Sequence, residues 1–110
     1  MTLIASLLAL AMQSEGYVVA STASTSVLAK ICKDADSDLA ADFCSGYVLA
    51  TFDLLSRKRL ICPTDGVTTE QTMAVARRYL ASHPELWDRS PSWVIERALV
   101  EAYRCRRNSN

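Results

Sequence analysis

The chain has 110 residues, half of them apolar, and its 12 Lys and Arg residues balance its 12 Asp and Glu residues. This length allows one domain with a modest core, and the neutral balance gives no support to a nucleic-acid partner, which usually requires a basic surplus. Only three glycines and three prolines interrupt the chain. So few breakers favour an all-α fold over a turn-rich β fold.

The first dozen residues carry no charge and contain an apolar run from Leu3 to Ala11. The run is too short to cross a bilayer as a helix, and it is typical of the apolar region of a signal peptide, although no Lys or Arg precedes it. A buried N-terminal helix is the alternative interpretation. We expect residues 1–23 to be a leader and a loose N-terminus, and residues 24–110 to form the folded domain. The mature chain is then periplasmic, without stable membrane insertion.

Two helices are predicted in the first half of the folded domain. The first, at about 26–33, is short, and Ser26 can cap it. The second, at about 38–56, follows an acidic stretch whose negative charge complements the positive end of the helix dipole. Gly46 lies inside the second helix at a cost of about 1 kcal/mol relative to alanine. A close approach by another helix would compensate for this cost.

The third helix is predicted at about 69–82. Thr68 and Gln71 have the spacing of a capping box, which satisfies backbone N–H groups at a helix start. Pro84 ends the helix because the residue before a proline, here His83, avoids the helical region.

The fourth helix follows a short connector, residues 85–89. Ser90 and Pro91 are its expected N-cap and first residue. Its apolar positions recur at helical spacing from Val94 onwards, and we expect the helix to end at Cys105.

Four cysteines, at positions 32, 44, 62 and 105, are typical of a small exported domain held by disulfides. Their spacing contains no Cys-x-x-Cys pair, and the only histidine, His83, lacks a ligand-spaced partner, so no metal is expected. Short connections favour antiparallel neighbouring helices. On that topology Cys32 and Cys44 lie at one end of the bundle and Cys62 and Cys105 at the other. Of the three possible pairings, we therefore predict Cys32–Cys44 and Cys62–Cys105.

The same topology separates the charges of the molecule. Basic residues gather at one end: Arg57, Lys58, Arg59, Arg104, Arg106 and Arg107. Acidic residues gather at the other end: Asp34, Asp36, Asp38, Asp42, Glu85 and Asp88. Such a separation either steers a charged partner or simply complements the helix ends in solvent.

No convincing catalytic constellation or phosphate-binding glycine loop is present, and we expect a protein that is not an enzyme and needs no cofactor. The connector is the best candidate for contact with a partner protein. A partly exposed tryptophan among charged residues is typical of an interface anchor. The predicted partner-binding residues are His83, Glu85, Trp87, Asp88 and Arg89. The position of His83 before Pro84 favours a residue that ends the third helix over a catalytic base.

Short motifs follow one another in order along the chain: Cys44-Ser45-Gly46-Tyr47-Val48, Asp53, Cys62-Pro63, Gly66-Val67-Thr68, Gln71, Tyr79-Leu80, His83-Pro84-Glu85, Ala98-Leu99 and Cys105. In order and spacing this segment resembles the Rap/Tai immunity proteins, periplasmic antidotes to the peptidoglycan amidases that type VI secretion injects. The resemblance implies an exported all-α domain with two disulfides, often a homodimer, that binds an amidase effector and blocks its cleft.

A small periplasmic acid chaperone is the alternative function. Its carboxylates would protonate at low pH and expose apolar surface, but a single histidine gives little sensitivity near neutral pH.

Overall fold

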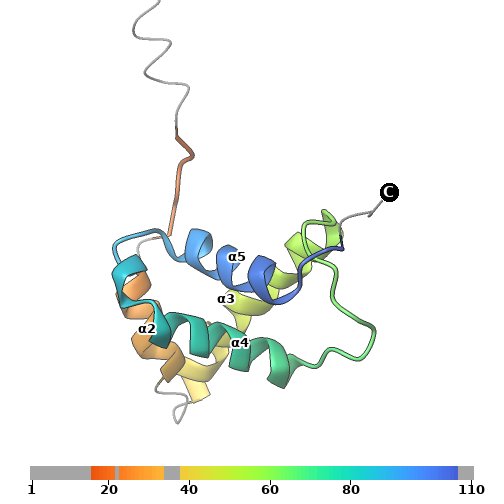
Figure 1. The fold of residues 1–110 in the computed structure, drawn as a ribbon. Coiled ribbons are helices and arrows are strands. Elements are labelled where there is room, and N and C mark those ends of the chain that lie inside the picture. Colours follow the sequence, from red (N-terminus) through yellow and green to blue (C-terminus); the bar gives the residue numbers. More distant parts are fainter. Residues whose placement is uncertain (1–15, 22, 34–37, 107–110) are drawn as a thin grey trace, which may run out of the picture.

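The computed structural model describes residues 16–21, 23–33 and 38–106, without the side chains of residues 38–41. These residues form four α-helices, one 3-10 turn and no strand (Figure 1). The elements are α2 (Thr25–Lys33), α3 (Asp38–Arg57), α4 (Thr69–Ser82), η1 (Pro84–Leu86) and α5 (Pro91–Ala102). The predicted all-α class and the four helical segments are confirmed. Most of the expected leader lies outside the described residues, so it stays a prediction.

Helix α2 begins one residue earlier than predicted. Ser24, rather than Ser26, is its cap: the Ser24 hydroxyl accepts a hydrogen bond of 3.3 Å from the backbone N–H of Val27. Thr25 is already helical and fully buried, and its hydroxyl donates to the carbonyl of Arg89 in the connector. The long-range contact of Thr25 therefore sets the start of this helix.

The capping box of α4 is confirmed. The Thr68 hydroxyl accepts from the N–H of Gln71 at 3.1 Å, and the Gln71 side chain accepts from the N–H of Thr68 at 2.9 Å. The helix ends at Ser82, with His83 as its C-cap before Pro84. Both ends of α4 are thus determined by local sequence.

Helix α5 starts at Pro91 as predicted but ends at Ala102, three residues before Cys105. Tyr103 leaves the helix, and its carbonyl accepts a hydrogen bond of 2.8 Å from the N–H of Cys62. Residues 104–106 lie outside the helix, where Cys105 forms the disulfide with Cys62. The prediction that this helix reaches Cys105 was therefore wrong.

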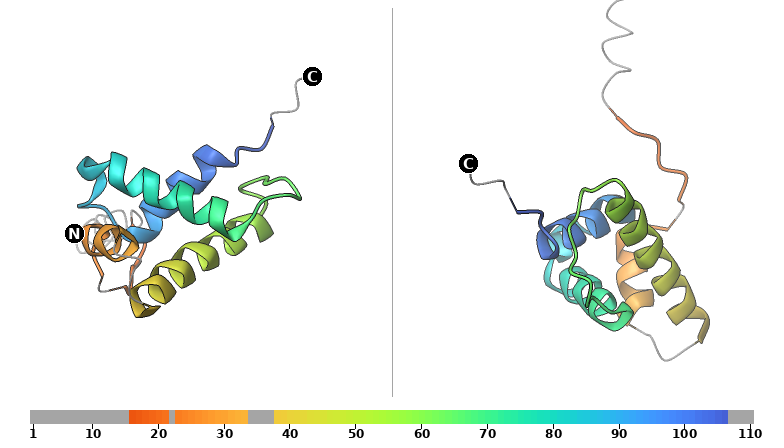
Figure 2. Two further views of the ribbon diagram at one scale, coloured as in Figure 1. Left: turned by 90° about the horizontal axis from the view of Figure 1, so that it is seen from below. Right: turned by 90° about the vertical axis from the view of Figure 1, so that its right-hand side faces the viewer.

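The core lies where α4 and α5 cross in contact with each other and α2 and α3 pack against them (Figures 1 and 2). All four helices contribute buried apolar residues, and α5 contributes the most continuous set: Val94, Ile95, Ala98 and Leu99. Burial at helical spacing explains why a chain with so few breakers forms helices here.

Both predicted disulfides are present. Cys32–Cys44 joins the end of α2 to α3, and Cys62–Cys105 joins the loop after α3 to the segment after α5. Cys32 and Cys44 are buried, at 1% and 0% exposure. Cys62 and Cys105 are exposed. The two bridges therefore differ in their access to solvent reductants.

The expected antiparallel topology also places the connector at the same end of the bundle as the Cys32–Cys44 bridge. This prediction was wrong. At its start α2 contacts the connector through Thr25 and Arg89, whereas at its end the Cys32 carbonyl accepts a hydrogen bond of 3.1 Å from the Arg77 side chain. The connector and this bridge thus lie at opposite ends of α2, about 13 Å apart for a helix of nine residues. The pairing was nevertheless right, because Cys32 and Cys44 flank one short connection.

Gly46 is exposed, and a Cβ added to it would meet nothing within 4 Å. The expected close approach of another helix does not occur within the described chain. This part of α3 instead presents a small residue to solvent.

Arg59, two residues after the last residue of α3, lies in the left-handed region, with φ of 59°. The N–H of Leu60 donates to the carbonyl of Leu55, and the N–H of Arg59 to that of Ser56. This is a Schellman motif in which glycine is the favoured residue at the Arg59 position. A non-glycine residue there costs on the order of 1 kcal/mol.

We expect Arg59→Gly to raise the free energy of unfolding by about 0.5–1 kcal/mol, measured by urea denaturation, because it removes this strain. Lys58→Gly is the matched control: it removes the same charge at a residue without positive φ and should lower stability by about 0.5–1 kcal/mol. Equal losses in the two variants would contradict the interpretation.

Candidate partner-binding site

The connector between α4 and α5 is fixed from its inner side. The indole N–H of Trp87 donates to the carbonyl of Leu80 at 2.9 Å, and the carbonyl of Arg89 accepts from the buried hydroxyl of Thr25. Backbone hydrogen bonds from Trp87 to Pro84 and from Arg89 to Leu86 close successive turns. The connector is therefore a rigid surface segment that would lose little conformational entropy on binding.

His83 has a structural role at the end of α4. Its Nδ1 lies 2.9 Å from the carbonyl of Tyr79, and its ring stacks on the Tyr79 ring with centroids 3.9 Å apart. Because a carbonyl only accepts, Nδ1 carries the proton and Nε2 is the nitrogen left for other partners. This geometry agrees with the interpretation of His83 as a helix-ending residue.

The five predicted contact residues do not form one patch. Glu85, Asp88 and Arg89 are exposed, whereas His83 and Trp87 are half-buried. Trp87 lines a groove between α2 and α4. Arg89 turns toward α5, where its guanidinium lies 5.0 Å from the ring centre of Trp93. The structure thus divides the predicted site between two faces.

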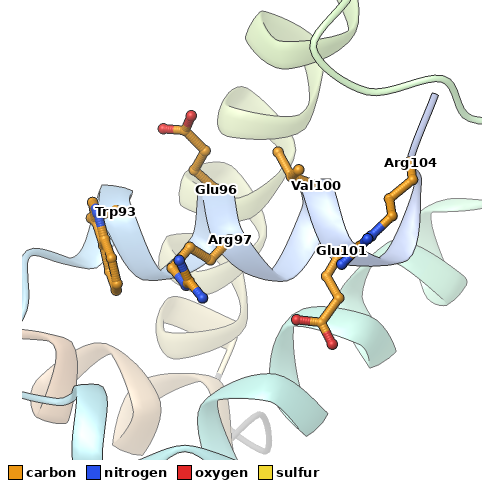
Figure 3. A pocket seen from close by; sticks show the side chains of 6 residues that line it. All are labelled: Trp93, Glu96, Arg97, Val100, Glu101 and Arg104. Atoms are coloured by element: carbon orange, nitrogen blue, oxygen red, sulfur yellow. The ribbon is translucent and has the colours of Figure 1, made fainter. Parts of the chain in front are cut away.

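The first face is the outer surface of α5 (Figure 3). Trp93 is flanked by the guanidinium groups of Arg89 and Arg97, at 5.0 and 4.8 Å from its ring centre. Such cation–π contacts at exposed sites stabilise by about 0.5–1 kcal/mol. A hollow of about 350 Å³ continues along the helix, lined by Trp93, Glu96, Arg97, Val100, Glu101 and Arg104. Its carboxylates and guanidinium groups alternate, so it favours neither sign of charge in a ligand.

The second face is the α2–α4 groove, a space of about 730 Å³. It is lined by Ser26, Ala29, Lys30 and Lys33 of α2, by Arg77, Arg78 and Ala81 of α4, and by Trp87. Two alanines and an indole ring form its apolar part, and four cationic side chains surround them. The Nε–H of Arg77 also donates to the carbonyl of Cys32, which ties the two helices together.

The sequence did not reveal this groove. Arg77 and Arg78 belong to one helix and Lys30 and Lys33 to another, so the spacing along either helix does not join them. Only the crossing of α2 over α4 brings the four cations together. We expected acidic residues to gather at the end of the bundle that holds the connector, but the groove beside the connector is cationic.

Among the residues that the structure describes, no three His, Cys, Asp or Glu side chains lie close enough to hold a metal ion. None of the described helices has the length and apolar composition needed to cross a bilayer.

This combination defines a small, disulfide-linked helical domain with two surfaces suited to binding another molecule. A family model described as Rap1a immunity proteins matches residues 24–105. The match covers well over half of the chain, and the chain belongs to this family. The resemblance inferred from the motifs is thereby confirmed, and family membership indicates an immunity protein for secreted effectors. No curated protein and no solved structure matches the chain.

Proposed function

We propose that this protein is a periplasmic immunity protein that binds a peptidoglycan amidase delivered by type VI secretion and blocks its cleft. The observation that carries the proposal is the match of residues 24–105 to the Rap1a immunity proteins. Inhibition by occlusion requires a shaped surface and no chemistry, so the protein is proposed to act by binding alone, without a cofactor or metal.

The disulfides support the proposed compartment. Two bridges persist in an oxidising space such as the periplasm and are rare in the reducing cytosol. The predicted leader in residues 1–23 would provide export. A peptidoglycan amidase acts in the same compartment, so its antidote has to be located there.

The connector supports occlusion of a cleft. Its backbone is held by Trp87 and Thr25, and it carries Glu85 and Asp88 exposed on its outer side. We propose His83, Glu85, Trp87, Asp88 and Arg89 as contact residues, with Trp87 as the anchor. Tryptophan and arginine are frequent among the residues that dominate interface energies.

The test is co-expression in the periplasm with candidate type VI amidase effectors. Cells that lyse with an amidase alone should survive when the exported protein is present, and Glu85→Lys/Asp88→Lys should weaken this protection. Continued lysis with every such amidase, with the oxidised protein detected in the periplasm, would refute the proposal. Suppressed aggregation of unrelated proteins at low pH, without protection from any amidase, would favour the chaperone alternative.

We further propose a homodimer through the outer face of α3. Phe43 and Leu54 are each 46% exposed there, and the exposed small residues Gly46 and Ala50 lie between them. In an antiparallel pairing of two α3 helices, Phe43 would meet Leu54 of the partner, and the small residues would allow close approach. The same pairing brings the exposed Asp42, near the start of α3, close to the exposed Arg57 of the partner.

We expect Leu54→Glu to convert the dimer to a monomer in sedimentation velocity, because it places a charge against the partner's Phe43 at both ends of the apolar contact. Val27→Glu is the matched control, since Val27 is 47% exposed on α2 and outside the proposed interface. A native protein that remains monomeric at high micromolar concentration would contradict the homodimer.

A further inference from the structure

The α2–α4 groove has one sign of charge. Among the residues that the structure describes, its lining includes Lys30, Lys33, Arg77 and Arg78 and no carboxylate. Along α5, by contrast, the hollow beside Trp93 contains both signs of charge. Four cations around one space repel one another, and an anionic occupant relieves this repulsion.

The floor of the groove is apolar. Ala29 and Ala81 are short, so the helices leave room above them, and the Trp87 side chain adds apolar surface to the lining. The indole N–H is already bonded to the Leu80 carbonyl, so Trp87 offers only its apolar ring to an occupant. A ligand therefore gains by placing an apolar side chain on this floor.

The dimensions of the groove limit the size of the occupant. Spaces of about 300–1,000 Å³ hold drug-sized ligands, and the groove has about 730 Å³. This volume suits one or two apolar side chains of a short segment. The flanking residues of that segment would meet the cationic rim.

From the charge, floor and size of the groove, we infer that it binds an acidic peptide segment of the partner protein, with one or two large apolar side chains on Ala29, Ala81 and Trp87. The identification of the partner as the neutralised effector rests on the proposed function. The rim cations, Lys30, Lys33, Arg77 and Arg78, then supply the preference for acidic residues.

The direct test uses the full mature protein, isotopically labelled, and two synthetic peptides. One carries a Leu-Phe pair flanked by Asp and Glu, and the other carries Lys in place of every acidic residue. In NMR titrations, the acidic peptide should shift the amides of Ala29 and Ala81 and the Trp87 indole N–H. The Lys peptide should not. Equal shifts with both peptides, or no shifts in the groove, would overturn the inference.

Charge-reversal variants test the rim. Lys30→Glu/Arg78→Glu should weaken binding of the acidic peptide at least tenfold. Lys58→Glu/Arg106→Glu makes the same charge change outside the groove and should leave binding within twofold. A native-like NMR spectrum establishes that each variant is folded. Equal weakening by both pairs would overturn a specific site, since it would show an effect of net charge alone.

Two other occupants are distinguished by the same assay. Vesicles containing phosphatidylglycerol that shift the groove resonances, when the acidic peptide does not, would overturn the peptide assignment in favour of a lipid surface. The Asp34→Asn/Asp36→Asn/Asp38→Asn variant tests the chain's own acidic stretch as the occupant. If this variant binds the acidic peptide and the native chain does not, the result would overturn the partner's peptide as the occupant of the groove.

The link to the effector is tested separately by co-expression. Loss of protection with Lys30→Glu/Arg78→Glu, but not with Lys58→Glu/Arg106→Glu, would support it. Full protection by a groove variant that no longer binds the acidic peptide would overturn the effector as occupant and leave the proposed function intact. Peptide binding in a protein that neutralises no amidase would support the groove and refute only the proposed function.

Discussion

Replacing Cys62 and Cys105 together by alanine is expected to lower the free energy of unfolding by about 4 kcal/mol in urea denaturation at neutral pH. The bridge closes a loop with a sequence separation of 43, so its removal restores much conformational entropy to the unfolded chain. Because small domains are stable by only about 5–15 kcal/mol, this loss is a large share of the total.

The Cys32→Ala/Cys44→Ala variant provides the comparison. Its loop, with a sequence separation of 12, accounts for about 3 kcal/mol on the same entropy model. Its two sulfur atoms are buried, so this variant also loses packing, whereas Cys62 and Cys105 are exposed. A Cys62→Ala/Cys105→Ala loss below about 1 kcal/mol would contradict the loop-entropy account.

Leu28→Ala is expected to lower the free energy of unfolding by about 3 kcal/mol, measured in the same way. Leu28 is fully buried in a helix of only nine residues, so its truncation leaves a cavity between α2 and the rest of the core. Since α2 forms one wall of the α2–α4 groove, the variant should also weaken binding of the acidic peptide.

Val27→Ala is the matched control for Leu28→Ala. Val27 is its neighbour on the same helix and is 47% exposed. Removing its methyl groups should change stability by less than about 0.5 kcal/mol. Similar losses in the two variants would show that α2 is held by its helical propensity rather than by the burial of Leu28.

The local parts of the fold were predictable because their causes lie within a few residues. The Thr68 hydroxyl and Gln71 side chain cap α4 across three positions, and Pro91 starts α5. The disulfide pairing was predictable because each pair flanks a connection or a shared end. The start of α2 was missed, since it depends on Thr25 reaching Arg89, 64 residues away.

The binding surface was only partly predictable. A tryptophan among charges indicated the connector, and Trp87 does lie at the edge of a groove. No sequence signal joined Lys30 of α2 to Arg78 of α4, because each is an ordinary exposed cation on its own helix. Gly46 misled for the same reason, since its open surroundings depend on where the other helices lie.

The sequence by itself determined the helical class, the caps, the disulfide-linked frame and the family, all of which follow from residue identity and short-range spacing. Tertiary structure alone decided that α2 crosses α4 and gathers four like charges around an apolar floor. The physical reason is that helix crossing depends on the shape of both packed faces together. A pattern read along one helix contains only half of that information.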